Sequence, residues 1–392
     1  MKILEVVDFF KPSWEAGGIV RICYEISKCL AKRGHDVTVY ATDGFKTRVN
    51  SPKNVPVNVD GIRTYYFKNA SNLLARRNFY TPYYLFFVAR KDILHYDIIH
   101  IHTYRSPMAL CIAWYARRNG IPYVIQPHGS LPKIVAKQRL KKLYDIVWGN
   151  KLLRSAEGVI VLTSIEAEQA IKMGVNKNKV HIIANGIDLS QYENIPLQGE
   201  FRALYNIPSN AHVILYLGRL HPIKGVDRLI RAFEIVLKEI DNCVLIVAGP
   251  DDGSLLKLKI LVKDLELCKK VIFTGPLYGR DKSTAYCDSD VYVLPSYYEA
   301  FPMTVLEAWA FKKPVIVTED CGMKDLLRDS GLVVQQNPYD LATAMKEYLH
   351  QDSLRHLHGQ NGYNKLKENL SVQKTAQNVE HLYREVVKSR DV

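Results

Sequence analysis

Short apolar runs alternate with amphipathic stretches along the whole chain. KILEVVDFF (residues 2–10) has the composition of a buried strand, and IVRICYEISKCLAKRG (19–34) has helical spacing that ends at Gly34. Further strand-like runs are HDVTVYAT (35–42), YDIIHIHT (96–103), IPYVIQPHG (121–129) and AEGVIVLT (156–163). Because helical patterns separate these runs, the sequence predicts an α/β fold with a doubly wound parallel sheet.

The alternation stops at residues 189–210 and then starts again. LSQYENIPLQGEFRALYNIPSN is polar and interrupted by Pro and Gly, which is typical of a connection. The second set of strand-like runs is HVILYLG (212–218), NCVLIVAG (242–249), KVIFTG (270–275), DVYVLPS (290–296), KPVIVT (313–318) and GLVVQ (331–335). We therefore expect two Rossmann-like domains, 1–190 and 191–372, facing a central cleft. The C-terminal helix, about 373–392, is expected to cross back onto the first domain.

The composition is that of a globular protein. Of 392 residues, 47% are apolar and 24% are charged. No apolar run approaches the roughly 20 residues that span a bilayer, and MKILEVVDFF lacks the cleavage site of a signal peptide. The seven cysteines include no C-x-x-C pair, which favours a reducing cytoplasm and argues against a zinc site or a disulfide framework.

Positive charge is concentrated in the first half. Residues 1–190 hold 28 Lys+Arg and 14 Asp+Glu, a balance of +14, whereas the remainder holds 25 and 26, a balance of −1. Within the first half, every charged residue of 133–154 is basic except Asp145. Helical spacing there gives an apolar stripe (Ala136, Leu140, Leu143, Val147) flanked by basic residues (Lys133, Lys137, Arg139, Lys141, Lys142). This pattern predicts either an ordinary core helix with a solvated face or peripheral contact with an anionic membrane.

Two motifs in the second half contain candidate ligand-binding residues. GRLHPIKG places Gly218, Arg219 and Lys224 after a strand and before a helix, where glycine backbone and cations suit a diphosphate, although turns with surface cations are common. In SYYEAFPMTVLEAWA, Glu299 precedes a helix that begins near Met303, and Glu307 lies inside it. Eight residues at helical rise span about 12 Å. Helix amides between two carboxylates suit a nucleotide sugar, with the ribose on Glu307 and the sugar on Glu299.

These motifs resemble a known family. EAFPMTVLE is similar to the E-x7-E signature of retaining GT-B glycosyltransferases of family 4 (group 1), and GRLHPIKG is similar to that family's phosphate-binding motif. TSIEAEQAIKMGV, IIANGIDLSQY, VAGPDDG and FTGPL follow in the family's order. The resemblance implies donor contacts at Phe301, Pro302, Met303 and Thr304, retention of anomeric configuration and independence from metal ions or other cofactors. Relatives often have Gly where this chain has Ala300 and Pro302, and Pro302 lacks one amide donor.

The first half also contains positions that the resemblance singles out. Gly17 and Gly18 lie between the first strand and the first helix, where a bare backbone allows a donor or acceptor to approach; a plain turn is the alternative. His128 follows the strand IPYVIQ and corresponds to the family's active-site histidine, which contacts the donor sugar; a structural loop histidine is the alternative.

Other readings of the motifs are weaker. His100 and His102 lie on one side of a strand, but the sequence offers no third metal ligand. Asp288 and Asp290 resemble a D-x-D metal motif but lie at the amino end of a strand, away from the binding edge. No metal site is therefore expected. A basic nucleic-acid-binding protein would explain the charge, but no known RNA module is present, so no nucleic acid is expected.

The sequence thus predicts a cytoplasmic enzyme, peripheral at most to the inner face of the membrane. It would transfer a hexosyl or N-acetylhexosaminyl group from a UDP- or GDP-linked sugar to a glycan or lipid-linked acceptor, in cell-surface polysaccharide or glycoconjugate synthesis. A nucleotide-sugar epimerase of the same fold is the alternative. The candidate catalytic residues are Glu299, His128, Arg219 and Lys224.

Overall fold

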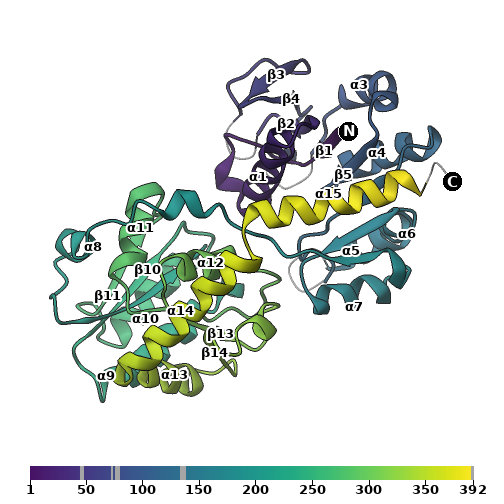
Figure 1. Cartoon of the computed structure of the whole chain (residues 1–392). Coiled ribbons are helices and arrows are strands. Elements are labelled where there is room, and N and C mark those ends of the chain that lie inside the picture. Colours follow the sequence, from purple (N-terminus) through teal and green to yellow (C-terminus); the bar gives the residue numbers. More distant parts are fainter. Residues whose placement is uncertain (45–47, 72–73, 76–79, 133–137, 390–392) are drawn as a thin grey trace. The chain divides into compact units, whose positions relative to one another are not determined.

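The computed structural model describes residues 1–392 except 45–47, 72–73, 76–79, 133–137 and 390–392. The chain forms two units (Figure 1). The first is Met1–Gly186 together with Val372–Val392, and the second is Ile187–Ser371. The boundary therefore lies at 186–187, where the sequence predicted 190, and the last helix is part of the first unit.

The first unit contains one eight-stranded sheet in the order β3-β4-β2-β1-β5-β6-β7-β8. Its strands are β1 (Lys2–Val6), β2 (Asp36–Thr42), β3 (Pro56–Val59), β4 (Ile62–Phe67), β5 (Ile98–Ile101), β6 (Tyr123–Ile125), β7 (Gly158–Val161) and β8 (Val180–Ile182). Every neighbouring pair is parallel except β3–β4. The β3–β4 hairpin is absent from the sequence prediction. Its turn, Asp60-Gly61, has positive φ at both residues, 53° and 86°, which suits a two-residue hairpin loop.

Helices cover both faces of this sheet. They are α1 (Gly18–Lys32), α3 (Leu85–Asp92), α4 (Pro107–Arg118), α5 (Gln138–Tyr144), α6 (Asn150–Arg154), α7 (Ser164–Lys172) and α15 (Val372–Lys388). Side chains of α3, α4, α6 and α7 belong to one core cluster, and those of α1 and α15 to another, as the alternation predicted. α15 packs beside α1, and its Leu382 is 3% exposed. The first sheet therefore needs residues from both ends of the chain.

The basic segment 133–154 differs from the single regular helix that was expected. Residues 133–137, which include Lys133, Ala136 and Lys137, lie outside the described part. The rest consists of α5, a π-helical turn (Asp145–Gly149) and α6. The described stripe residues Leu140, Leu143 and Val147 are exposed, so they do not form an ordinary core stripe.

The second unit contains a six-stranded parallel sheet in the order β11-β10-β9-β12-β13-β14. Its strands are β9 (His212–Leu217), β10 (Cys243–Ala248), β11 (Val271–Gly275), β12 (Val291–Leu294), β13 (Val315–Thr318) and β14 (Gly331–Val334). Counted from β9, this is the strand order 3-2-1-4-5-6 of a dinucleotide-binding sheet. The predicted doubly wound fold is confirmed in both units.

Seven helices accompany this sheet in the described part of the second unit. They are α8 (Glu200–Leu204), α9 (Val226–Leu237), α10 (Leu255–Asp264), α11 (Gly279–Asp288), α12 (Met303–Ala310), α13 (Pro338–His350) and α14 (Asp352–Asn369). α9 packs against α10 and α13, and α12 packs against α14. Trp309 of α12 is fully buried and donates its indole N–H to the carbonyl oxygen of Ser330 at 3.1 Å. This anchor fixes the position of α12, whose first turn faces the candidate site.

The sequence predicted no membrane-spanning segment and no disulfide framework. Among the helices that the structure describes, none is both long and apolar enough to cross a bilayer. All seven cysteines are free thiols, and three of them, Cys23, Cys243 and Cys321, are buried.

Candidate active site

The candidate donor site lies where the strand order of the second sheet reverses. β9 and β12 are neighbours in the sheet although β10 and β11 separate them along the chain. The loop after β12 reaches the loop after β9, because the amide of Tyr297 donates to the carbonyl oxygen of Ile223 at 2.8 Å. Open parallel sheets bind ligands at such a switch point. The two motifs GRLHPIKG and SYYEAFPM therefore meet at one edge of one sheet.

Lys224 and Glu299 form an ion pair at this edge. Lys224 ends a short 3-10 helix (Pro222–Lys224), and its Nζ contacts Oε1 of Glu299. The same oxygen accepts a hydrogen bond from Oγ of Ser296 at 2.8 Å. The two side chains of the pair are 16% and 13% exposed. Charges this shielded need partners. An anion bound to Lys224 would leave the Glu299 carboxylate to accept hydrogen bonds from other groups.

Arg219 lies next to this pair in sequence but reaches the surface. Its guanidinium donates to Oδ2 of Asp252 at 2.6 Å, and its side chain is 60% exposed. The hydroxyl of Tyr216 donates to the backbone carbonyl of Arg219 at 2.9 Å and fixes the loop. A Cβ on Gly218 would lie 2.8 Å from that hydroxyl. An exposed ion pair contributes little stability, so breaking the contact with Asp252 to bind another anion would cost Arg219 little.

The start of α12 lies between Glu299 and Glu307, as predicted. Pro302 is the N-cap residue, and Phe301 before it is buried. The amides of Met303 and Thr304 occupy the first two helical positions, where no acceptor exists within the helix. They form the positive end of the helix and favour an anion. The hydroxyl of Thr304 accepts a hydrogen bond from Tyr292 at 2.7 Å, which orients its side chain.

The side chain of Glu307 points into the second unit and is buried. It is 6% exposed, and its Oε1 accepts from Nζ of Lys282 at 2.6 Å and from the hydroxyl of Tyr192 at 3.5 Å. Its Oε2 accepts from the hydroxyl of Tyr286 at 3.3 Å. Lys282 is a contact that the sequence analysis missed, because it lies on a different helix, α11. A ribose on Glu307 would have to share a carboxylate that already has three partners.

The carboxylates of Asp288 and Asp290 have structural partners. Asp288 accepts from the amides of Gly199, Phe201 and Arg202 at 2.7–3.0 Å and so caps α8. Asp290 accepts from the amide of Val213 at 2.7 Å. Both lie at the amino end of β12, as predicted, on the edge opposite Glu299.

In the first unit, His128 follows β6 in an unusual backbone conformation. Its φ is 51°, a left-handed value that costs energy for a residue with a side chain. Nε2 of His128 lies 3.0 Å from Nδ1 of His102, and the two rings stack with centroids 5.3 Å apart. The contact with His102 thus holds His128 in one orientation.

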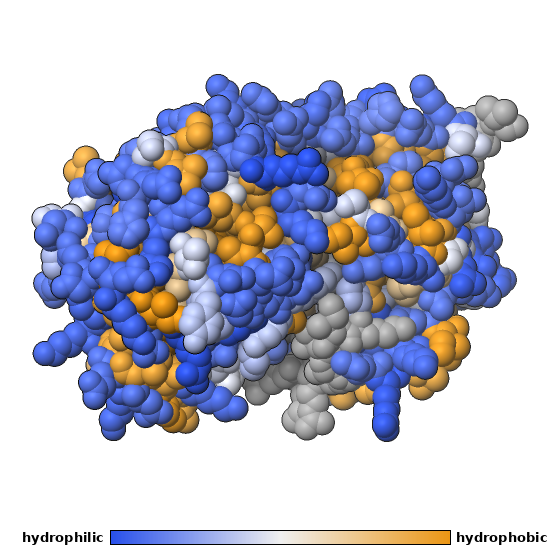
Figure 2. Space-filling model, turned by 90° about the horizontal axis from the view of Figure 1, so that it is seen from below, coloured by the Kyte–Doolittle hydropathy of each residue, from blue (hydrophilic) through white to orange (hydrophobic). Residues whose placement is uncertain are grey.

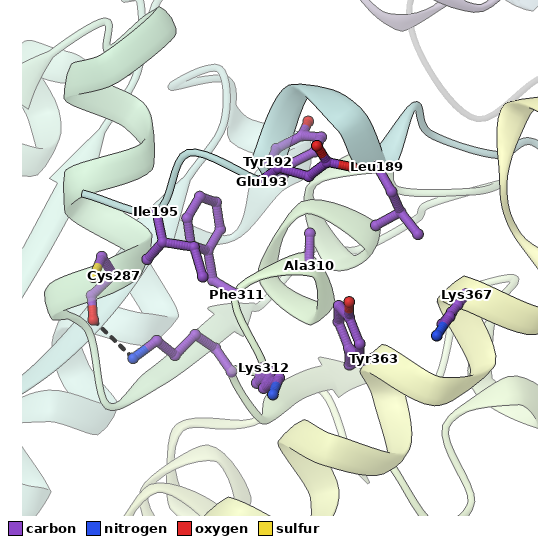
Figure 3. A pocket seen from close by; sticks show the side chains of 11 residues that line it. Leu189, Tyr192, Glu193, Ile195, Cys287, Ala310, Phe311, Lys312, Tyr363 and Lys367 are labelled. Carbon is purple, nitrogen blue, oxygen red and sulfur yellow. Dashed lines mark hydrogen bonds between the residues drawn. The ribbon is translucent and has the colours of Figure 1, made fainter. Parts of the chain in front are cut away.

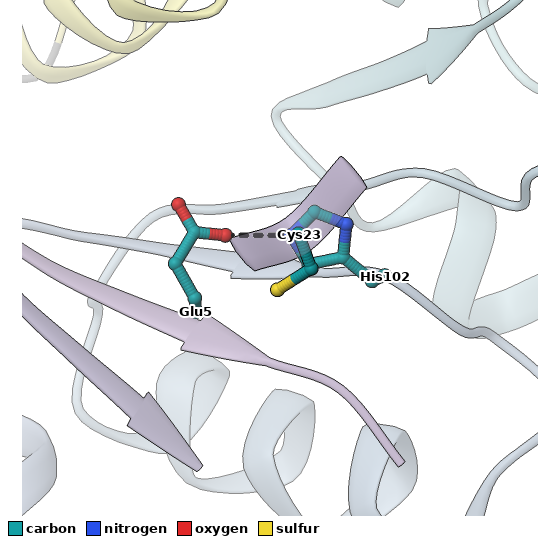
Figure 4. Close-up of side chains that lie close together, drawn as sticks. All are labelled: Glu5, Cys23 and His102. Atoms are coloured by element: carbon teal, nitrogen blue, oxygen red, sulfur yellow. Dashed lines mark hydrogen bonds and ion pairs between the residues drawn. The ribbon is translucent and has the colours of Figure 1, made fainter. Parts of the chain in front are cut away.

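Glu5 lies behind this histidine pair, fully buried in β1. Its Oε2 is 2.7 Å from Nε2 of His102 and 3.2 Å from Nδ1 of His100, and its Oε1 accepts from the hydroxyl of Tyr383 at 3.1 Å. Figure 4 shows the contact between Glu5 and His102. Because a carboxylate only accepts, Nε2 of His102 carries a proton and its Nδ1 accepts from His128. Nδ1 of a neutral His128 therefore remains an acceptor.

The protonation states of this cluster follow from its burial. Burial, with the nearby His100, lowers the pKa of His102 to about 4. Burial also lowers the pKa of His128 well below its ordinary value. For Glu5, burial raises the pKa, but the charges and hydrogen bonds of His100 and His102 outweigh it and lower the pKa to about 2. At neutral pH, Glu5 is ionised while His102 and His128 are neutral.

Gly17 and Gly18 begin α1. Gly17 is the N-cap residue with φ 103°, and Gly18 is the first helical residue. A Cβ on Gly17 would meet nothing within 4 Å, so the positive φ, and not crowding, requires glycine there. This geometry fits a plain turn as well as an approach to a ligand.

Both units match models of glycosyltransferase families. Residues 16–191 match Glycosyltransferase Family 4, and residues 198–365 match Glycosyl transferases group 1. The chain is a family 4 (group 1) glycosyltransferase. The resemblance drawn from the motifs is thereby confirmed.

Curated relatives of this glycosyltransferase have a common name. A D-inositol 3-phosphate glycosyltransferase of Kineococcus radiotolerans is 26% identical over 374 residues, with 86% of this chain and 83% of the relative covered. A D-inositol 3-phosphate glycosyltransferase 2 of Catenulispora acidiphila is 28% identical over 357 residues, with 84% and 81% covered.

Solved structures confirm the GT-B fold. Anabaena HepE in complex with UDP and glucose has a TM-score of 0.79 at 19% identity and covers 98% of this chain and 100% of its own. A sucrose-phosphate synthase from Thermosynechococcus elongatus has a TM-score of 0.76 at 22% identity and covers 99% and 100%.

A cavity of about 530 Å³ in the second unit lies away from the candidate site of this glycosyltransferase. Figure 3 shows its lining around the end of α12, with Ala310 between Leu189 and Tyr363 and with Phe311 and Lys312 next in the chain. α12 runs from the switch-point edge at Met303 towards this cavity, so the two places are at opposite ends of one helix. The carboxyl end of a helix is negative and does not favour a phosphate.

Glu5, Cys23 and His102 are residue types that can bind a metal ion, and they lie close together. The ligand atoms of Glu5, Cys23 and His102 lie within 4.8 Å of one another (Figure 4), and the sequence analysis identified neither Glu5 nor Cys23 as a partner for the histidines. Yet Glu5 and His102 are 2.7 Å apart, a hydrogen-bond distance, whereas two ligands of a tetrahedral zinc ion lie about 3.3 Å apart. Burial raises the pKa of the Cys23 thiol well above its ordinary value. The contacts are those of a hydrogen-bonded network.

Glu5 and Tyr383 are the polar residues of this cluster that sequence reasoning missed. Glu5 interrupts the apolar run KILEVV, and a charge in a buried strand indicates a buried partner. Tyr383 is nearly the whole chain away in sequence, so nothing local connects it to Glu5. Only the return of α15 to the first sheet brings them together.

We predict that His102 and His128 are both neutral with the proton on Nε2 at pH 6, because burial lowers the pKa of each. Long-range ¹H–¹⁵N NMR of labelled histidines reports both the charge and the tautomer. The unfolded chain binds these protons near the ordinary histidine pKa of about 6.5. The stability contribution of His102 is therefore complete above about pH 6.5 and is lost as the pH falls through its folded pKa of about 4.

Glu5→Gln should weaken the preference of His102 for a proton on Nε2, since an amide can either accept from or donate to that nitrogen, while the exposed Glu15→Gln should change nothing. A charged imidazolium at His102 or His128 at pH 6, or a proton on Nδ1 of His102 in the wild type, would contradict the hydrogen-bond assignment.

Proposed function

We propose that the chain transfers a hexosyl or N-acetylhexosaminyl group, with retention, from a UDP- or GDP-linked sugar to a glycan or lipid-linked acceptor. The observation that supports this best is the ion pair between Lys224 and Glu299 at the switch point of the second sheet, beside Arg219 and the first turn of α12. HepE, a structural neighbour, was solved with UDP and with UDP-glucose.

Donor binding exchanges the partners of these charges. The diphosphate binds Lys224, which leaves Glu299, and Arg219, which leaves Asp252. Its oxygens also accept hydrogen bonds from the amides of Met303 and Thr304. Glu299 then accepts hydrogen bonds from sugar hydroxyls. Glu307 shares its carboxylate with the ribose, and Phe301 and Pro302 shape the turn between the two carboxylates.

The bond between the anomeric carbon and the phosphate breaks with oxocarbenium character. Arg219 and Lys224 stabilise the negative charge that develops on the leaving diphosphate, the role that a divalent metal ion has in other enzymes. The acceptor hydroxyl attacks from the same face, and its proton goes to the leaving phosphate oxygen. His128 contacts the donor sugar, and its free Nδ1 accepts a hydrogen bond from a sugar hydroxyl.

The setting of this reaction is part of the proposal. We assign the enzyme to the cytoplasm, in the synthesis of cell-surface polysaccharide or glycoconjugates, with the first unit binding the acceptor near Gly17 and Gly18. The acceptor panel should include D-inositol 3-phosphate, which the names of the curated relatives specify.

A transfer assay with labelled UDP- and GDP-sugars, with and without acceptors, tests the function and the site together. We expect product only with an acceptor, whereas an epimerase would alter the donor without one. Lys224→Ala and Glu299→Gln should each reduce kcat by about 10²–10³-fold, because Lys224 stabilises the charge that develops on the leaving diphosphate and Glu299 orients the sugar through its hydroxyls.

Lys257→Ala is the matched control, since Lys257 is exposed on α10 of the same unit. Circular dichroism verifies that each variant is folded. Activities of both site variants within threefold of wild type would rule out this site.

Transfer should persist in excess EDTA, because side-chain cations and helix amides take the place of a metal ion at the diphosphate. The measurement is the initial rate before and after chelation, with Mg²⁺ or Mn²⁺ added back. Loss of activity that either ion restores would contradict metal independence.

A further inference from the structure

One face of the first unit combines exposed apolar side chains with positive charge. It consists of α3, α4 and the helical stretch from α5 to α6. Leu85 of α3, Ile112 of α4 and Leu153 of α6 belong to the same core cluster, so these elements cover one face of the sheet. We call their outward surface the α3–α6 face.

Aromatic side chains crowd the α3 and α4 part of this face. Tyr83, just before α3, is 55% exposed, and on the two helices Phe86 is 48%, Phe87 59% and Trp114 50% exposed. α3 and α4 pack side by side (Figure 1), and Phe86 stacks on Trp114 with ring centroids 6.4 Å apart and planes 23° apart. Arg118 lies over Trp114, 5.5 Å from its ring centroid. Aromatic side chains next to arginines are typical of the boundary between headgroups and acyl chains.

Aliphatic side chains continue the pattern along residues 138–148. Leu140 is 63% exposed, Leu143 58% and Ile146 64%. The π-helical turn at Asp145–Gly149 adds Val147 and Trp148 to the exposed set. Single exposed hydrophobic groups are ordinary, and Figure 2 shows several among hydrophilic ones on the side it presents. The α3–α6 face differs because large apolar side chains recur on consecutive elements.

The charges of this face have one sign. Exposed basic residues occur on every element: Arg90, Lys91, Arg117, Arg118, Arg139, Lys142, Lys151 and Arg154. The acids of these helical segments, Asp92 and Asp145, both have inward partners. Asp92 accepts from the hydroxyls of Tyr40 and Tyr65 at 3.4 Å, and Asp145 is buried and paired with Arg105 at 2.9 Å. Much of the excess charge of the first half therefore lies on this face.

The opposite face of the same sheet provides an internal comparison. The exposed positions of α15 carry Gln, Lys, Asn, His, Arg and Glu, and no apolar residue. α15 is thus an ordinary solvated helix, with charges of both signs. Of these two faces of the first sheet, the α3–α6 face combines exposed apolar groups with unbalanced positive charge, and the surface of α15 does not.

We propose that the α3–α6 face binds an anionic lipid surface. Its cations complement acidic headgroups, its aromatic rings suit the interface, and Leu140, Leu143 and Ile146 enter the acyl boundary. A nucleic acid would use the arginines and the rings but would leave the aliphatic residues without a partner. This surface extends the contact expected from residues 133–154 to α3 and α4. It does not rest on the proposed sugar transfer.

Flotation of the full chain with vesicles tests the proposal. Vesicles of phosphatidylcholine alone are compared with vesicles that contain one third phosphatidylglycerol, at low and at high salt. We expect binding to anionic vesicles at least about tenfold above neutral ones, weakened by salt. Phe86→Ser with Phe87→Ser, and separately Lys91→Glu with Arg117→Glu, should each lower that binding by about tenfold.

Two controls match these changes. Lys32→Glu with Lys388→Glu reverses two exposed charges on α1 and α15, which cover the opposite face of the first sheet. Tyr339→Ser removes an exposed aromatic ring from α13 of the second unit. Both should bind as wild type does.

Equal binding to neutral and anionic vesicles, or unchanged binding of both α3–α4 variants, would overturn the proposal. Tighter binding to a random oligonucleotide than to vesicles would overturn it as well. A dimer in light scattering that Phe86→Ser with Phe87→Ser dissociates would also overturn the proposal, because the α3–α6 face would then bind a second copy of the chain.

Discussion

The backbones that leave β9 and β12 approach each other so closely that side chains are excluded between them. A Cβ on Gly225 would lie 2.2 Å from the carbonyl oxygen of Pro295, and φ at Gly225 is +63°. At the end of the neighbouring strand β10, a Cβ on Gly249 would lie 1.8 Å from the carbonyl oxygen of Gly218, which follows β9. This close approach brings Lys224 onto Glu299. Without it, the cations after β9 and the carboxylate after β12 would belong to separate loops, and the switch point would have no charged centre.

The first unit depends on a different constraint, a buried carboxylate that needs hydrogen-bond donors. Glu5 obtains them from His100 on β5, from His102 just after that strand and from Tyr383 on α15. A single ionised group thereby connects the first strand, a neighbouring strand and the last helix. It also determines the tautomer of His102 and, through it, that of His128. The tautomer of His128 therefore depends on Glu5 and His102, which belong to none of the family motifs.

Local patterns predicted the two sheets, the start of α12 at Met303 and the position of Asp288, because these depend on short-range spacing and turn residues. The β3–β4 hairpin was missed although Asp60-Gly61 is a strong turn pair. Other features lay beyond such patterns. Periodicity gave the apolar stripe at Leu140 but not whether it packs inward, since that depends on neighbouring helices. The Lys282 contact of Glu307 and the Tyr383 contact of Glu5 join distant segments, which one sequence does not connect.

The central claim is that the switch point of the second sheet binds the diphosphate of a nucleotide sugar. Hydrogen exchange of the full chain, with and without saturating UDP, UDP-glucose or a GDP-sugar, tests it most directly. We expect slower exchange in peptides that cover Gly218–Lys224 and Ser296–Thr304 with at least one of these ligands, and unchanged exchange around the cavity at Leu189 and Tyr363. Protection at that cavity without protection at the switch point would contradict the account, as would no protection with any of the ligands.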